Sequence, residues 1–512
     1  MLGFILVIIY SFVISINMAI AAINIAAINI AVINEDKNQA LNPSSILKII
    51  LEKNFDIIIS DYNTKEKEGD LKKSYGEFDT NLKYSYVLDK NDIPSSSSLD
   101  GAGNTSSVIT ENSTHTLRVT KTLQNGIKFD VPYIYKSVYS NSSYRTIQTS
   151  YEPSLGVVLT FPIIKIFSDQ YFSKNIKNKE LELEIALKKH SEKIIEVFSD
   201  TIDLYFDIVE SIKSLEITKI ALENSKENYL FALEKDKVGR ISMIDLLDAE
   251  SAVKSNEDEL LKKENDTLNK TEKLSLNIWG EITKINLPIY NNFENTALIS
   301  SSLSSEEDVL KTAFEKRIEI SKTKEARNQA QMKFDSSKID LYPTLDLQPE
   351  ITLRGMNSKG SDANEDIIEK KYTSWKVGLT IERKWNQYAA VAANRMDELK
   401  LLQEKIKEEQ AKKDITLEVK QALRDISSLE KRLLSLKMAL KAQNEKYKAL
   451  NAKFKMGVVS MFDLNEAYKG KMQSDLDLLK AYIEYRKKLI SLFKAKGTLI
   501  EELLTNKNTI LN

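Results

Sequence analysis

Strict alternation of apolar and polar residues is found in both halves of the chain. Tyr84 and Tyr86, for example, flank Ser85 and share one face with Leu82 and Leu88. Side chains of a strand point alternately to its two faces, so the pattern predicts strands with one apolar and one polar face. The strands predicted in this way are 76–89, 152–161, 344–354 and 374–383. Strands of about ten such residues are typical of a membrane β-barrel. The alternative is a half-buried sheet in a soluble domain, but two strands per half are too few for a stable sheet of that kind.

The first half contains one further element of this kind, at 115–139. Two alternating segments there flank Asn125-Gly126. An Asn-Gly pair between alternating segments is a strong signal for a two-residue hairpin turn. The hairpin either extends the sheet of the first half or projects from it.

Long segments without glycine or proline follow the strands in each half. One lies between Pro162 and Gly239 and the other between Gly378 and Gly457. Each is followed by a shorter segment, which ends at Gly280 in the first half and at Gly497 in the second. Since glycine and proline interrupt helices, we expect long helices at 163–238 and 386–456 and shorter ones at 242–279 and 460–496. The apolar residues of the first long helix do not all lie on one stripe of its surface. This distribution indicates that the helix packs against neighbours on two sides, as in a helix bundle or the wall of a helical barrel.

The two halves are copies of one another. KDKVGRISMIDLLDA (235–249) and KFKMGVVSMFDLNEA (453–467) are identical at more than half of their positions. The copies are predicted to span 43–288 and 306–500, joined by a polar linker at 289–305 and followed by a tail at 501–512. Equal element order in both halves makes this an internal duplication.

Each copied motif has the pattern of a tight turn between two helices. Gly239 suits the left-handed position after a helix, Ser242 suits the cap of the next one, and Asp245 completes a capping box. Gly457, Ser460 and Asp463 repeat this arrangement. The sequence therefore predicts two antiparallel helical hairpins, and the capping role alone accounts for these residues.

The N-terminal segment 1–34 contains no charged side chain. An apolar stretch followed by Ala19-Ile20-Ala21 is typical of a secretory signal cleaved near residue 21. The segment has no basic residue at its start and is long enough to span a bilayer, so a retained anchor is the alternative, and a buried soluble helix is a third. No second stretch of this kind follows.

Composition narrows the classes of function. Lys and Arg together number 73 and Asp and Glu 74, which argues against a nucleic-acid-binding protein. Cysteine is absent, so disulfides, thiolate metal sites and a lipid-bearing cysteine are excluded. The two histidines are His115 and His190, and no phosphate-binding loop or metal-ligand spacing accompanies them. We expect no enzyme, no cofactor and no metal site.

Several short motifs occur in a fixed order, and one of them is duplicated. They are VGRISMIDLLDAE (238–250), MGVVSMFDLNEA (456–467), LGVVLTFPI (155–163), WKVGLTIERKW (375–385) and Tyr342-Pro343-Thr344. By the order, spacing and duplication of these motifs, the chain resembles outer-membrane efflux proteins of the TolC-like family over about residues 43–500.

The resemblance implies a fold and a set of partners. Proteins of this family are homotrimers in which each chain gives four strands to a twelve-stranded barrel in the outer membrane. Long helices continue the barrel as a hollow α-helical tunnel through the periplasm. The family acts with a periplasmic adaptor and an inner-membrane transporter, as the exit duct of tripartite efflux or type I secretion systems, without chemistry or an obligatory cofactor.

The resemblance also implies roles for the duplicated turns, where adaptor hairpins dock. The corresponding residues are Val238, Gly239, Arg240, Ile241 and Ser242 in the first copy and Met456, Gly457, Val458, Val459 and Ser460 in the second. Acidic residues after the second turn narrow the tunnel entrance, and here these are Asp463 and Glu466. For Asp463 a pore role and a cap are equally open. Some relatives lock the entrance with an acid in the first turn, present as Asp245, and an arginine in the second, where this chain has Val459.

A periplasmic adaptor is the main alternative, since adaptors also have long helical hairpins and an N-terminal signal. An adaptor would show one hairpin flanked by glycine-rich β-domains, and this chain has two equal hairpins with membrane-type strands. A filament-forming coiled coil would leave the alternating aromatic strands unexplained. We therefore expect a mainly helical protein with a membrane β-sheet that acts as an outer-membrane channel.

Overall fold

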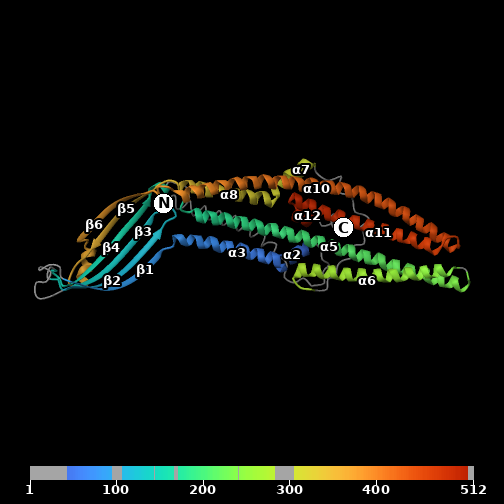
Figure 1. Ribbon diagram of the computed structural model, residues 1–512, viewed down its shortest axis with the longest axis horizontal. Helices are drawn as coiled ribbons and strands as arrows, with labels where there is room; N and C mark the ends of the chain where they lie inside the picture. Colours follow the sequence, from blue (N-terminus) through green and yellow to red (C-terminus); the bar gives the residue numbers. More distant parts are fainter. Residues whose placement is uncertain are drawn as a thin grey trace.

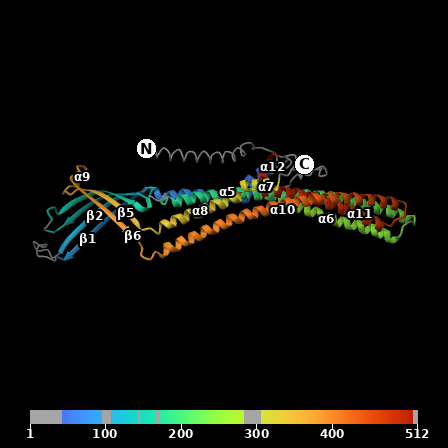
Figure 2. The ribbon, with the colours of Figure 1, turned by 90° about the horizontal axis from the view of Figure 1, so that it is seen from above.

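The structure is a computed structural model that describes residues 43–94, 107–142, 145–166, 171–239, 241–282 and 305–505. These residues form an elongated molecule with a β-sheet at one end and the ends of two helical hairpins at the other (Figures 1 and 2). The predicted signal segment 1–34 and all of the linker except residue 305 lie outside the described residues. No helix among the described residues is long and apolar enough to cross a bilayer.

The first half begins with two helices and continues with four strands. Its elements are α2 (Pro43–Lys53), α3 (Phe55–Tyr75), η1 (Gly76–Phe78), β1 (Asn81–Pro94), β2 (Ser107–Thr122), β3 (Lys128–Ser140), β4 (Thr149–Pro162), α4 (Ile163–Ile166), α5 (Lys174–Lys237) and α6 (Met243–Trp279). Sequence alternation gave no indication of α2 and α3, which pack beside α5 and α6.

The second half repeats this order with two strands. Its elements are α7 (Glu306–Lys316), α8 (Ile318–Ile339), β5 (Thr344–Arg354), α9 (Gly360–Ile368), β6 (Tyr372–Glu382), α10 (Tyr388–Lys455), α11 (Met461–Lys496) and α12 (Leu499–Thr505). With 68 residues, α10 is about 100 Å long at 1.5 Å per residue. The two predicted antiparallel hairpins are present as α5–α6 and α10–α11.

All six strands form one antiparallel sheet in the order β1-β2-β3-β4-β5-β6. The sheet therefore has two strands more than the four per chain that the family resemblance implies for the barrel. The additional pair is the predicted hairpin, in which the Gly126 N–H donates to the Leu123 carbonyl (2.8 Å) and Gly126 has φ +85°. The hairpin extends the sheet and does not project from it, because β2 pairs with β1 and β3 pairs with β4.

Several element boundaries differ from the prediction, among them the end of the first strand (94, not 89) and the start of the hairpin (107, not 115). The strand expected from residue 76 begins at Asn81, because α3 ends in the turn η1. The helix expected over 163–238 is divided into α4 and α5. At this bend Tyr171 is buried, donates to the carboxylate of Asp340 and accepts from Lys165 (2.9 Å), so the chain is anchored to the second half where strand becomes helix.

The hydrophobic core lies at mid-length, where α2, α7 and α12 surround the long helices (Figure 1). One cluster joins α5 to α2, α6, α11 and α12 around Phe198, Ile202 and Tyr205. A second joins α10 to α7 and α11 around Leu433 and Tyr485. Helix α11 contributes to both clusters and so connects the two halves.

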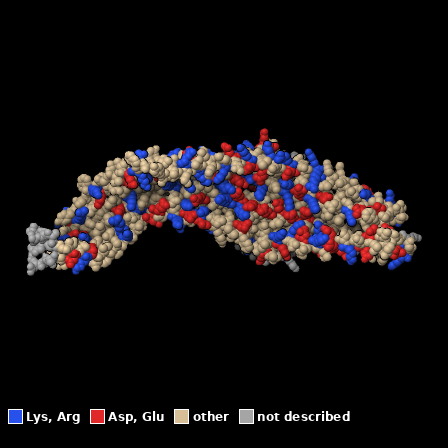
Figure 3. Space-filling model, in the orientation of Figure 1, with Lys and Arg blue, Asp and Glu red and all other residues tan. Residues whose placement is uncertain are grey.

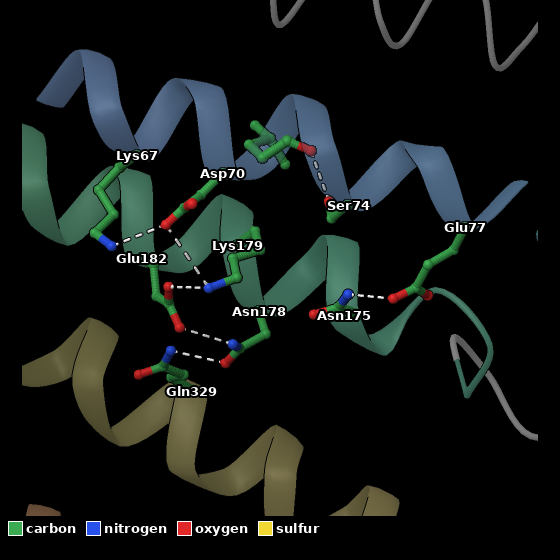
Figure 4. A network of polar contacts seen from close by, with 10 residues as sticks. Lys67, Asp70, Ser74, Glu77, Asn175, Asn178, Lys179, Glu182 and Gln329 are labelled. Atoms are coloured by element: carbon green, nitrogen blue, oxygen red, sulfur yellow. Dashed lines mark hydrogen bonds and ion pairs between the residues drawn. The ribbon is translucent and has the colours of Figure 1, made fainter. Parts of the chain in front are cut away.

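Closer to the sheet, α3, α5 and α8 are joined by polar contacts (Figure 4). Lys179 of α5 contacts Glu182 at 2.8 Å and Asp70 of α3 at 4.0 Å. Asn178 donates to Glu182 (2.8 Å) and accepts from Gln329 of α8 (2.7 Å). Polar side chains therefore take part in the packing of these three helices. Figure 3 shows the corresponding surface, with basic and acidic side chains interleaved over the helices and sparser over the sheet.

Candidate functional site

The ends of the two helical hairpins lie together at the tip opposite the sheet. In the first turn, Gly239 has φ +66° and its N–H donates to the Asp236 carbonyl (2.9 Å). In the second, Gly457 has φ +77° and donates to the Phe454 carbonyl (2.9 Å). A Cβ at either glycine would meet no atom within 4 Å, so glycine is favoured here by backbone conformation and not by packing.

Both turns have the predicted serine cap, and in each the aspartate of the predicted capping box is bonded to the serine hydroxyl. Ser242 Oγ accepts from the Asp245 N–H (3.1 Å) and donates to the Asp245 carboxylate (2.7 Å). Ser460 Oγ accepts from the Asp463 N–H (3.2 Å) and donates to the Asp463 carboxylate (2.7 Å). Each cap satisfies an amide at the start of its helix and fixes the direction in which the chain re-enters the hairpin.

Asp245 also joins the two turns. Its Oδ1 accepts a hydrogen bond from the Met461 N–H at 3.3 Å, at the start of α11. A carboxylate at the N-terminus of a helix is stabilised by the helix dipole. The chain therefore has a contact between the two turns that uses a backbone amide, where the family resemblance suggested an arginine and the sequence has Val459.

A small apolar cluster supports the tip. It comprises Ala232, Ala249, Phe454, Met461 and Leu464, with Ile241 and Leu246 packed against it. The rings of Phe231 and Phe454, from the two halves, lie 5.6 Å apart. Phe231 and Phe454 were not predicted from the sequence, although each occupies the last two turns of a long helix and so could have been assigned to the tip.

A cleft of about 650 Å³ lies between the two turns. Its lining includes predicted turn residues, the aromatic pair and two lysines: Phe231, Lys235, Gly239, Ile241, Ser242, Asp245, Phe454, Lys455, Met456, Gly457, Val458, Val459, Ser460 and Met461. Val238, Met456 and Val458 are 64%, 70% and 72% exposed, which leaves apolar side chains in water at the tip. The predicted residue Arg240 lies outside the described residues.

The two acidic residues after the second turn have different surroundings. The Asp463 carboxylate takes part in its capping box, whereas Glu466 forms an exposed ion pair with Lys469 at 3.4 Å. Glu466 lines a second cleft of about 200 Å³ between α6 and α11, together with Asp248 and Tyr468. Burial raises the pKa of Tyr468 to about 12, although the hydrogen bond from Asn224 (3.0 Å) lowers it.

The sequence profile of the outer membrane efflux protein family matches residues 132–280 and 309–498, which is more than half of the chain. The chain belongs to this family. It is an outer-membrane efflux channel whose helices lie on the periplasmic side. A search of curated protein sequences finds no match. The alternative of a periplasmic adaptor has no support from these comparisons.

Solved structures of outer-membrane channels have the same fold. CusC is 16% identical with a TM-score of 0.63, covering 91% of this chain and 95% of its own. The CmeC outer membrane channel of Campylobacter jejuni is 13% identical (TM-score 0.61), covering 92% and 93%. VceC of Vibrio cholerae is 10% identical (TM-score 0.64), covering 89% and 96%. At these identities the likeness concerns the fold alone.

Proposed function

We propose that this efflux channel is a homotrimeric exit duct that passively conducts substrates from a periplasmic adaptor and an inner-membrane transporter to the outside of the cell. The observation that carries the proposal is the combination of one sheet with two free edges and helices about 100 Å long. A bilayer admits only closed barrels, so the sheet needs further copies to remove its edges. The helices then continue the barrel as a tunnel.

The adaptor is proposed to dock at the tip cleft. Exposed apolar side chains beside a preformed cleft are typical of protein interaction sites. Here Val458 and Met456 present such side chains, and Lys235 and Lys455 add a basic rim. This arrangement suits the end of a partner hairpin that has both apolar and acidic residues.

Electron microscopy of the detergent-extracted native protein tests the duct. We expect a threefold hollow cylinder longer than about 100 Å, with detergent around one end only. A soluble monomer, or a rod without a detergent belt, would contradict the proposal.

Glu466 is proposed to contribute to a ring of three carboxylates at the tunnel entrance, with Asp463 beside it. Such a ring favours cations in a narrow pore. In planar bilayers we expect Glu466→Gln to lower the cation-to-anion permeability ratio by roughly 2-fold to 5-fold, since three charges leave the entrance.

The matched control is Glu445→Gln on α10. Glu445 forms the same kind of exposed ion pair, with Lys448 at 2.9 Å, but is absent from the clefts at the tip. The control is expected to keep the wild-type ratio. Equal selectivity of Glu466→Gln and wild-type channels would remove Glu466 from the pore.

A further inference from the structure

The hairpin β2–β3 separates β1 from β4 within the sheet. β1 pairs with β2, β2 with β3, and β3 with β4, each in antiparallel register. The hairpin thus occupies a position in the middle of the sheet, at which both of its strands have neighbours on both sides. If the hairpin belongs to the channel wall, its apolar and polar faces must lie on the same sides of the sheet as those of the other strands.

One row of paired residues crosses all six strands and is almost entirely apolar. The row is Tyr84, Leu117, Tyr133, Leu155, Leu353 and Thr373. The adjacent row on the opposite face is mainly polar: Ser85, Thr116, Ile134, Ser154, Arg354 and Tyr372. On that same face Arg118 and Asp130 form an ion pair within the hairpin at 3.3 Å. The hairpin therefore shares one apolar and one polar face with the strands on either side.

The apolar segment shifts steadily along the strands from one edge of the sheet to the other. In β6 the apolar segment is 375–381, and all of it lies between the row residue Thr373 and the helices. In β1 the apolar segment is 82–88, and most of it lies beyond the row residue Tyr84, on the side away from the helices. The shift is about one residue per strand, which corresponds to a strand tilt of roughly 40° if the apolar band is level in the membrane. Barrel strands tilt by about 35–45°.

An aromatic group on the same face, just beyond the apolar row on the side away from the helices, includes both strands of the hairpin. The ring of His115 lies 4.7 Å from Tyr86 and 6.4 Å from Tyr135, and Tyr135 lies 6.0 Å from Tyr151. These residues belong to β2, β1, β3 and β4, respectively. The aromatic contacts therefore continue without interruption from β1 through the hairpin to β4.

From these observations we infer that β2 and β3 are part of the barrel wall, and that three copies of the six-stranded sheet close into an eighteen-stranded barrel. The inference rests on the trimer of the proposed function. Its partner is a second copy of this chain, whose β6 pairs with the free edge of β1. Exposed apolar residues reach both edges, with Leu82 at 66% and Trp375 at 77%. Because barrel diameter grows roughly linearly with strand number, the exit would be about 1.5 times wider than that of a twelve-stranded barrel.

Single cysteine substitutions test whether the hairpin lies in the membrane wall, whatever the number of chains in the barrel. Each introduced cysteine would be the only one to react, because the chain has none of its own. Thr116→Cys and Leu117→Cys are a matched pair of neighbours on opposite faces of β2. In lipid nanodiscs we expect Thr116→Cys to react with a charged, water-soluble maleimide at least 10-fold faster than Leu117→Cys. Conversely, a fluorophore on Leu117→Cys should be quenched by brominated lipid. Equal reaction rates would overturn the assignment of the hairpin to the membrane wall.

Deletion of residues 107–140 tests the strand count. It leaves β1 and β4 antiparallel, with Tyr84 able to face Leu155 directly, since both belong to the apolar row. We expect electron microscopy to show a threefold particle whose barrel diameter is about two-thirds of the wild-type value, as for eighteen strands reduced to twelve.

The wild-type particle provides a second measurement that does not require the deletion variant to fold. Eighteen strands around a threefold axis are expected. A threefold particle with twelve strands, or an unchanged diameter after deletion, would overturn the eighteen-stranded barrel and leave the duct intact. A twofold particle closed by twelve strands would overturn both the eighteen-stranded barrel and the trimer. The reaction rates of Thr116→Cys and Leu117→Cys would still show whether the hairpin lies in the membrane wall.

Discussion

Val458→Asp is expected to abolish export while the trimer still assembles in the outer membrane. Val458 is 72% exposed at the second turn and lines the tip cleft. Burying a carboxylate there against the apolar side chains of a partner costs about 2–4 kcal/mol, or roughly 30-fold or more in affinity. The measurement is growth of a deletion strain carrying the variant, in the presence of compounds to which loss of the channel sensitises the cells.

Val458→Thr is the matched control because it keeps the shape of the side chain without adding charge. We expect Val458→Thr to keep most of the wild-type export. Both variants should give the same amount of assembled trimer. Since Gly457 holds the turn by its backbone conformation, neither substitution should alter the fold of the tip. Wild-type export by Val458→Asp would show that the partner docks elsewhere.

Local patterns in the sequence predicted the hairpin turns because the signals involved are local. Gly457 and Ser460 occupy a left-handed position and a helix cap, and both requirements act within a few residues. Asn125-Gly126 likewise specified a hairpin whose strands the structure contains as β2 and β3. The alternation at 344–354 coincides with β5, because Pro343 precedes it and Gly355 follows.

Contacts between the halves could not be predicted in this way. The pairing of β4 with β5 joins Leu155 to Leu353, and no local pattern specifies that register. The hydrogen bond from the Met461 N–H to Asp245 depends on how two similar turns are placed in space. The family resemblance gave Asp245 a place in a lock between the two turns, but Val459 stands where the arginine was sought, and nothing in the sequence pointed to a backbone amide as the partner. Helices α3 and α8 were missed because their polar faces, which contact α5 through Asp70 and Gln329 respectively, lack the apolar periodicity that was sought.

Arg317→Met is expected to destabilise the middle of the molecule by about 2–4 kcal/mol. Arg317 lies between α7 and α8, and its side chain is only 11% exposed. It forms ion pairs with Glu319 (2.7 Å) and with Glu418 of α10 (2.9 Å). It also donates to the Lys494 and Ala495 carbonyls at the C-terminus of α11, both at 3.3 Å. Methionine would fill the space but remove both ion pairs and both hydrogen bonds, so the thermal midpoint of the helical circular dichroism signal should fall by several degrees.

The control is Arg432→Met, which removes a second arginine–glutamate pair between α10 and α11, to Glu484 at 2.9 Å. Both of its side chains are about half exposed, so the loss should be below about 1 kcal/mol. Burial alone would raise the pKa of Glu319, but the hydrogen bond and charge of Arg317 hold this pKa below its usual range. Stability from this pair is therefore fully present above the ordinary glutamate pKa of about 4.3 and is lost as the pH falls through the lower folded value. The difference between wild-type protein and Arg317→Met should shrink accordingly in acid, and a difference independent of pH would show that packing, and not the ion pair, makes Arg317 important.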